Sequence, residues 1–330
     1  MQLRRAINLF YEEPDPDRWL PFDHWPRRLV RRLVRGPYQP GGQMRVFLNL
    51  KAGLDQIGAR YRINDYRHIR ANPDELACLI GKPHILGKFS PRTPLLFGSS
   101  IYNHPIDDES LPSRHAIRQV LVPSAWVQRM FSAVWPGLVS VWPVGIDTKR
   151  WAPDASATKD VDILVYDKIS RDRQHYATTL IDPLMGELRR RGLVVEYLRY
   201  GAYREHQLHA LSRRVRSMIY LSRYETQGIA LEQMLAAGVP VLAWDAGGDW
   251  QNLKYSRRGV RFGPVTTVPY WDDRCGRKFA SATDFAPILE DFWRAVQRDA
   301  FAPREMILER KLTLEGAAQA YVELVEKYDG

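Results

Sequence analysis

Residues 221–248 read LSRYETQGIALEQMLAAGVPVLAWDAGG, and the pattern in this stretch decides the fold. An apolar run ends at Ser222, a polar loop carries Glu225 and Gly228, and apolar residues then recur at helical spacing as far as Gly238. A second apolar run begins at Val239 and leads to a Gly-Gly pair. This order predicts strand, loop, helix and strand, which is the repeating unit of a parallel sheet covered by helices.

The loop in this stretch has the chemistry of an anion-binding turn. The first N–H groups of a helix have no partner inside the helix, so they favour an anion such as a diphosphate. Gly228 allows a ligand to approach the backbone closely. Glu225 before the helix and Glu232 one turn inside it offer carboxylates to sugar or ribose hydroxyls. Taken alone, an isolated pair of glutamates is more typical of a helix–strand unit with two solvated side chains.

The same alternation of strand-like and helix-like segments runs through the chain. The strand-like runs are 6–12, 59–65, 75–81, 94–100, 118–124, 138–147, 161–167, 193–201, 217–222 and 239–245, and the helix-like runs are 44–58, 124–134, 173–191, 205–215 and 228–238. A chain of 330 residues exceeds what one hydrophobic core usually supports. The sequence therefore predicts an α/β protein with two doubly wound, Rossmann-like domains that face a cleft and join near residues 148–160.

The stretch 221–248 resembles the donor domain of retaining GT-B glycosyltransferases, glycosyltransferase family 4 (glycosyl transferases group 1) in particular. The matching residues are Leu231, Glu232, Met234, Ala236, Gly238, Pro240, Val241, Gly247 and Gly248. The family usually has seven residues between its two glutamates, whereas six separate Glu225 from Glu232. The resemblance implies that Glu232 binds the nucleotide ribose. It also implies that the donor sugar and diphosphate are held by Glu225, Thr226, Gln227, Gly228 and Ile229.

Other segments agree with this resemblance. Residues 120–131 and 141–153 are similar to the stretch that leaves the first domain, and 303–328 to the closing helices. Lys168 and Arg173 have the spacing of the family's diphosphate-binding Arg and Lys with the residue types exchanged, and Arg171 competes for the second role. Gly41 and Gly42 resemble the phosphate or acceptor loop of the first domain. The predicted divisions are 1–147 on the acceptor side, 148–305 for the nucleotide sugar, and 306–330 for helices that cross back to the first domain.

The catalytic group is less specific in the sequence. His84 and His104 each follow an apolar run, where many relatives place a histidine near the transferred sugar, but a lone histidine also suits a structural or surface role. The resemblance implies retention without a protein nucleophile, because the departing phosphate guides the acceptor. No Asp-X-Asp pair is placed to hold a plausible metal near a predicted strand end, so we expect a reaction that needs no metal and no cofactor besides the nucleotide-sugar donor.

Charge and composition bear on partners and location. The net charge is +10, and residues 1–147 carry 20 Lys and Arg against 13 Asp and Glu. Residues 26–35 combine arginines with an apolar face, which predicts contact with an anionic membrane and a lipid-linked acceptor, although an ordinary surface helix fits as well. With only two cysteines and no secretory signal, we expect a cytoplasmic protein, peripheral at the inner face of the membrane.

Three other functions remain open at this point. A basic protein that binds or modifies nucleic acid fits the charge, but no aromatic residues alternate with the cations as base-stacking platforms would, so nucleic acid is not expected. A nicotinamide enzyme would need G-x-G-x-x-G after the strands at 6–12 or 161–167, and neither has it. An inactive relative that binds a sugar nucleotide without turnover is compatible with the shortened glutamate spacing.

Overall fold

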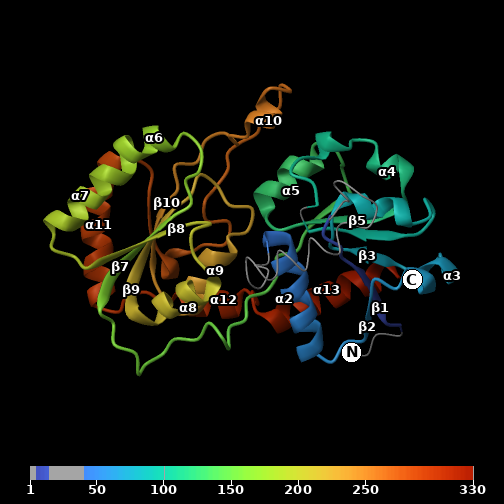
Figure 1. Ribbon diagram of the computed structural model, residues 1–330, viewed down its shortest axis with the longest axis horizontal. Coiled ribbons are helices and arrows are strands. Elements are labelled where there is room, and N and C mark those ends of the chain that lie inside the picture. The colour runs from blue at the N-terminus through green and yellow to red at the C-terminus, as the bar shows by residue number, and fades with distance from the viewer. Residues whose placement is uncertain (1–4, 15–40, 100, 330) are drawn as a thin grey trace, which may run out of the picture. The chain divides into compact units, whose positions relative to one another are not determined.

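The chain divides into two compact units, each built on one sheet (Figure 1). The computed structural model describes residues 5–14, 41–99 and 101–329. Unit 1 comprises the described residues up to Pro123, Gln128–Val144 and the C-terminal segment from Leu314, and unit 2 comprises Ser124–Val127 and Gly145–Thr313. Both sheets are entirely parallel. The prediction of an α/β protein with two helix-covered parallel sheets is confirmed.

Unit 1 is organised around six parallel strands. They are β1 (Ile7–Phe10), β2 (Tyr61–Ile63), β3 (Ala77–Leu79), β4 (Leu95–Phe97), β5 (Ile117–Val122) and β6 (Val139–Val141). Their order is β2-β1-β3-β4-β5-β6, so the chain reverses its winding direction between β1 and β3. Strands β1, β3 and β4 are buried at every position, as expected for parallel strands with both faces covered.

The helices of unit 1 include the last one of the chain. They are α2 (Gly42–Gln56), α3 (Tyr66–Ala71), η1 (Pro83–Lys88), η2 (Pro105–Asp107), α4 (Leu111–Arg114), α5 (Ala125–Ser132), which starts in the short segment of unit 2, and α13 (Leu314–Tyr328). Helix α13 packs directly on α2 (Figure 1). A Cβ atom on Gly53 would lie 2.3 Å from the carbonyl oxygen of Leu314, so only glycine allows this approach. The Trp142 indole also donates a hydrogen bond of 2.9 Å to the Ala317 carbonyl.

Unit 2 contains five parallel strands in the order β11-β10-β9-β7-β8. They are β7 (Val161–Asp167), β8 (Val195–Arg199), β9 (Val215–Leu221), β10 (Val241–Trp244) and β11 (Gly276–Phe279). Its helices are α6 (Arg173–Tyr176), η3 (Ala177–Ile181), α7 (Asp182–Arg190), α8 (Glu205–Arg214), α9 (Ile229–Ala236), α10 (Leu253–Ser256), η4 (Asp273–Cys275), α11 (Ala282–Gln297) and α12 (Pro303–Glu309). The expected helix over 173–191 contains a π-helical turn, η3, just before Pro183, whose ring nitrogen has no proton to donate.

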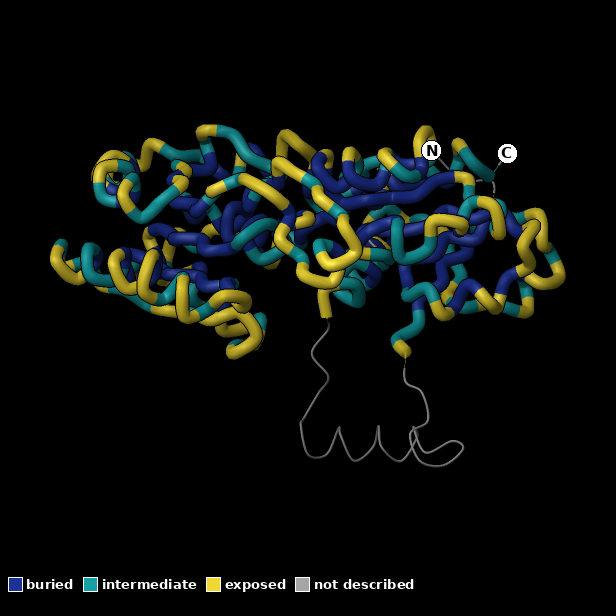
Figure 2. Tube along the Cα trace, turned by 90° about the horizontal axis from the view of Figure 1, so that it is seen from above, coloured by how far each residue is buried: buried dark blue, intermediate teal, exposed yellow. Residues whose placement is uncertain are grey.

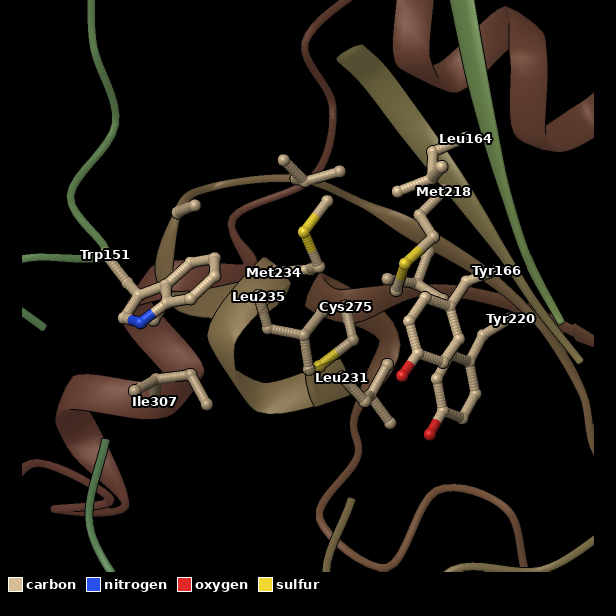
Figure 3. Packing of buried hydrophobic residues seen from close by; sticks show 14 of the residues in the cluster. Trp151, Leu164, Tyr166, Met218, Tyr220, Leu231, Met234, Leu235, Cys275 and Ile307 are labelled. Carbon is tan, nitrogen blue, oxygen red and sulfur yellow. The ribbon is translucent and has the colours of Figure 1, made fainter. Parts of the chain in front are cut away.

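Two apolar clusters cover the two faces of the unit 2 sheet. Met218 and Tyr220 of β9 belong to one cluster, whereas Ile219 and Leu221 belong to the other. This alternation follows from the two-residue period of a strand. Strands β7, β9 and β10 are buried at almost every position, whereas β8 at the edge of the sheet is half-buried or exposed. Figure 2 shows the buried segments of the chain in dark blue, and Figure 3 shows Leu231, Met234 and Leu235 of α9 within one of the two clusters.

Two of the sequence-based hypotheses bear on membranes. No helix among the described residues is both long and apolar enough to cross a bilayer. The basic segment 26–35 lies outside the described residues.

Candidate functional site

The candidate site lies at the carboxyl ends of β7 and β9, where the unit 2 sheet reverses its winding direction. Asp167 and Leu221 pair at the ends of these strands, and the Lys168 amide donates to the Leu221 carbonyl at 2.8 Å. Helix α9 begins at Ile229 after Gly228, which has φ of +90° and so adopts a left-handed conformation that favours glycine. Open α/β sheets bind their ligands at this kind of position.

The Glu225 carboxylate is buried and already has several donors. Oε1 accepts hydrogen bonds from the Tyr220 hydroxyl at 2.7 Å and the Ser222 hydroxyl at 2.9 Å. The Lys168 ammonium lies 2.7 Å from Oε1 and 2.8 Å from Oε2. This cluster holds Lys168 at the end of β7, with its ammonium also 4.9 Å from the centre of the Tyr200 ring. Both carboxylate oxygens of Glu225 are therefore engaged within unit 2.

Glu232 is in a different situation. It is 1% exposed, and its Oε2 accepts a hydrogen bond of 2.8 Å from the Gln227 side-chain amide. Among the described residues, Oε1 of Glu232 has no hydrogen-bond partner. Burial raises the pKa of this carboxyl to about 8, and the nearby negative charge of Glu225 acts in the same direction. A buried oxygen without a partner is costly, so Oε1 is poised to form a hydrogen bond with a ligand hydroxyl.

Tyrosines support the site from the apolar cluster behind it. The Tyr166 and Tyr220 rings stack with centroids 5.3 Å apart and an interplanar angle of 14° (Figure 3). The Tyr166 hydroxyl lies 2.7 Å from that of Tyr203, which gives both hydroxyls a hydrogen bond. Burial raises the pKa of Tyr220 well above its usual value, so this hydroxyl keeps its proton and donates a hydrogen bond to Glu225.

The two cations of the predicted diphosphate clamp have different partners. Lys168 contacts Glu225, whereas the Arg173 guanidinium pairs with the buried Asp167 carboxylate and donates to the Tyr197 hydroxyl at 2.9 Å. Arg171, the competing candidate, is exposed on the same loop. Lys168 is thus the cation that the structure brings together with the glutamate loop.

The other predicted donor-side residues follow one another in the loop before α9. Thr226 is exposed, Gln227 and Gly228 are buried, and Ile229 is half-buried as the first residue of the helix. A Cβ on Gly228 would have only ordinary contacts at 3.6 Å, so the backbone conformation, rather than lack of space, requires glycine.

Sequence analysis did not identify Arg223. Its guanidinium lies over the Tyr176 ring at 4.7 Å and over the Trp244 ring at 5.9 Å, and burial lowers its pKa. The sequence offered one signal for this residue, its position directly after Ser222 at the end of a strand. Its aromatic partners lie at the ends of α6 and β10, and a single sequence does not show that these two elements meet Arg223.

The loop after β10 is the second feature that sequence analysis missed. The Asp245 carboxylate accepts hydrogen bonds from the Thr266 hydroxyl at 3.0 Å, the Thr267 amide at 2.9 Å and the Lys278 ammonium at 3.2 Å. The Glu225 amide donates to the Thr266 carbonyl at 3.0 Å. Asp245 therefore fixes a distant segment against the glutamate loop.

The predicted residues of unit 1 lie at separate places. Gly41 caps α2 with φ of −66°, Gly42 is its first residue, and no heavy atom lies within 4 Å of a Cβ built on either. His84 is exposed on η1. His104 is buried and caps η2, with its Nδ1 accepting from the Ile106 amide at 3.0 Å. This bond gives His104 a local structural role.

Acidic residues do not gather as metal ligands in the described part of the chain. No group of three or more His, Cys, Asp or Glu side chains is placed there to hold an ion. Aspartates are adjacent in the sequence at 107–108 and 272–273. Of these, Asp272 contacts Arg274 at 3.0 Å, and Asp108 pairs with Arg114.

Comparison with known proteins places the fold. Neither a family model nor a curated protein matches the chain. Among solved structures, a sucrose-phosphate synthase from Thermosynechococcus elongatus has a TM-score of 0.55 at 14% identity, and 98% of this chain and 99% of that one are covered. WaaG, a glycosyltransferase of lipopolysaccharide biosynthesis, has a TM-score of 0.50 at 11% identity, with 87% and 97% covered.

TarM has a TM-score of 0.51 at 12% identity over 79% of this chain, and this chain spans only 57% of the TarM structure. At sequence identities of 11% to 14%, these structural similarities establish the fold alone. The chain has the two-sheet GT-B fold of these glycosyltransferases.

Proposed function

We propose that this protein is a glycosyltransferase of the family 4 type, which moves a sugar from a nucleotide-sugar donor to an acceptor hydroxyl. The observation that carries the proposal is Glu232, a buried carboxyl with one oxygen unpartnered among the described residues, in the first turn of a helix that follows a left-handed glycine. The shared fold supports it. A solved structure of S. aureus TarM contains UDP and α-GlcNAc-glycerol, which makes a uridine-diphosphate sugar a sensible first donor to test.

In this proposal the donor nucleotide binds to unit 2. Glu232 Oε1 forms a hydrogen bond with a ribose hydroxyl, and the amides of Gln227, Gly228 and Ile229 donate to the diphosphate at the start of α9. The Lys168 ammonium, which contacts Glu225 of this loop, neutralises the departing phosphate. Glu225 holds Lys168 in place, with Thr226 exposed beside it towards the donor sugar.

The chemical step in this proposal is transfer with retention, without a metal. Negative charge develops on the diphosphate as the glycosidic bond breaks, and Lys168 with the α9 N-terminus stabilises that charge. Arg173, which is held by Asp167 and the Tyr197 hydroxyl, is the second cation of this proposal. His84 and His104 remain the candidates for contact with the transferred sugar, and Gly41 and Gly42 for the acceptor loop. Full activity in a chelating buffer, with an axial product from an axial donor by NMR, would support both features.

The acceptor is proposed to be a carbohydrate or a lipid-linked glycan in polysaccharide or glycolipid synthesis. Its support is the basic segment 26–35, which suits an anionic membrane surface. Such an acceptor agrees with a cytoplasmic enzyme that is peripheral to the membrane. Transfer to vesicle-bound acceptor, lost on charge reversal at Arg28, Arg31 and Arg32, would test this part separately.

The donor is tested by thermal shift against UDP-, GDP-, ADP- and TDP-sugars. A ligand at about 100 times its dissociation constant adds roughly 2.7 kcal/mol of stability, a shift of a few degrees. We expect one base to stabilise the protein, Glu232→Ala to abolish the shift, and the exposed control Glu290→Gln to retain it. The absence of any shift would contradict the proposal, and binding without transfer would favour an inactive relative.

A further inference from the structure

Residues 249–264, which connect the loop after β10 to the segment that leads to β11, form a projection that we call the basic arm (Figure 1). Helix α10 lies at its tip, and in Figure 1 it stands away from the sheet of unit 2. Its residues are not among the donor-side residues named above, although Trp250 lies edge-on to Tyr224 of the loop before α9, with ring centroids 6.4 Å apart.

The basic arm is a folded structure with a closed base. The Trp250 amide donates to the Phe262 carbonyl at 2.7 Å, and the Val265 amide donates to the Gly248 carbonyl at 3.0 Å. The Trp250 ring stacks on Tyr255 of α10, with centroids 4.9 Å apart and an interplanar angle of 29°. Trp250 and Tyr255 are both buried. The arm therefore presents its tip residues on a fixed frame.

The tip carries one sign of charge and one prominent apolar side chain. The cations of the arm are Lys254, Arg257, Arg258 and Arg261, all of them exposed, and its one acidic residue is Asp249. Leu253, the first residue of α10, is 60% exposed, the largest exposure of any large apolar residue among those described. The arm thus offers an apolar side chain surrounded by positive charge.

We propose that the basic arm is a contact site for an anionic lipid bilayer. Cations near a bilayer are attracted to acidic headgroups, and an apolar side chain among them enters the boundary with the acyl chains. Arginine suits this position, because its aliphatic stem lies along apolar groups while the guanidinium stays at the headgroups. A nucleic-acid site would have aromatic rings exposed for stacking, whereas Trp250 and Tyr255 are buried in the frame. Membrane contact by the arm is separate from the donor chemistry proposed above.

Vesicle co-sedimentation tests the charge. The full-length chain is mixed with phosphatidylcholine vesicles with or without phosphatidylglycerol, beside a variant with Arg257→Glu, Arg258→Glu and Arg261→Glu. Each cation near an anionic surface contributes roughly a 5-fold gain in partitioning, so we expect the variant to bind at least about 100-fold more weakly. The matched control reverses Arg92, Arg189 and Arg298, exposed cations elsewhere with the same total change of charge, and is expected to lose far less.

A fluorescent label tests insertion of the tip. Both cysteines of the chain, Cys78 and Cys275, are buried, so Leu253→Cys introduces an accessible thiol for an environment-sensitive dye. We expect the dye emission to shift to the blue with anionic vesicles and to shift less with neutral vesicles. The control is a dye at Val194→Cys, a position elsewhere in unit 2 where the native side chain is 55% exposed, and its emission is expected not to shift.

Three outcomes would overturn the proposal. They are equal vesicle binding by the arm variant and wild type, equal dye responses at the two labelled positions, or an arm variant that loses retention on DNA but not on vesicles. Donor-induced thermal shifts are expected to be unchanged in the arm variants. Failure of the arm proposal and failure of the glycosyltransferase proposal therefore give different results.

Discussion

The buried carboxyl of Glu232 couples the stability of unit 2 to pH. Its pKa is raised from 4.5 to about 8 in the folded protein, so between these values the folded chain binds a proton that the unfolded chain releases. The free energy of unfolding therefore falls as pH rises through this window. We expect Glu232→Gln to gain stability relative to wild type between about pH 5 and pH 9, measured by urea unfolding.

The control for this measurement is Glu290→Gln on α11. Arginine partners lower the pKa of the exposed Glu290 carboxyl, so it stays ionised throughout the same window. Glu290→Gln is expected to change the free energy of unfolding by a similar amount at about pH 5 and at about pH 9. If Glu232→Gln behaved in the same way as this control, the carboxyl would not be held protonated in the folded protein.

The second prediction at the residue scale concerns Glu225 and Lys168. Glu225→Ala leaves the Tyr220 and Ser222 hydroxyls without their acceptor and Lys168 without its counter-ion. Removal of one partner of a buried ion pair lowers the free energy of unfolding by about 3–5 kcal/mol. Because the Lys168 side chain is 29% exposed and water screens its charge, we expect a loss of about 2–3 kcal/mol here. A double-mutant cycle with Lys168→Met should give a coupling of about 1–2 kcal/mol by urea unfolding. Additive effects would mean that the two groups do not interact.

At the scale of elements, the packing of α2 on α13 depends on Gly53. The nearest atom to a Cβ at this position is backbone, the Leu314 carbonyl oxygen at 2.3 Å, so it cannot rotate away. We expect Gly53→Ala to destabilise unit 1 by about 1–3 kcal/mol in spite of the better helix propensity of alanine. Gly186 in α7 is the matched control, because no heavy atom lies within 4 Å of its Cβ position. Gly186→Ala should stabilise by up to about 1 kcal/mol in thermal unfolding.

Sequence patterns predicted the buried elements better than the exposed ones. The apolar runs of β7, β9 and β10 identify them directly, because both faces of these strands are covered. Strand β11 was missed, since it is only four residues long and two of them are Arg277 and Lys278. Helix α3 is short and mostly polar, and its first turn depends on a cap by Asp65 rather than on apolar periodicity.

For the candidate site, the sequence predicted residues within one contiguous stretch better than it predicted their partners. The positions of Gly228 before α9 and of Glu232 in its first turn were predicted because both lie in one contiguous string that forms a loop and a helix. Arg173 was assigned to the diphosphate by its spacing from Lys168, but spacing says nothing of Asp167, the buried carboxylate with which it pairs. The partners of Glu225 were equally hidden, because the use of Tyr220 and Ser222 depends on where their hydroxyls point.

At the scale of the whole molecule, unit 1 is discontinuous in sequence. Its sheet comes from the first part of the chain, whereas α13 comes from the C-terminal segment. Helix α13 buries Leu314, Ala317, Ala318, Tyr321, Val322 and Val325. Unit 1 therefore cannot complete its core until residues 314–328 are present, while unit 2 needs none of them.

Truncation after Thr313 tests this dependence. Each large apolar side chain of α13 contributes about 1.5–3 kcal/mol by burial, so their combined loss approaches the whole stability of a typical domain, about 5–15 kcal/mol. We expect calorimetry to lose the unfolding transition of unit 1 and proteolysis to cleave within residues 41–123, while nucleotide still shifts the transition of unit 2. A chain that lacks only residues 329–330 keeps α13 and should retain both transitions. Survival of the unit 1 transition without α13 would show that its sheet and remaining helices form a sufficient core by themselves.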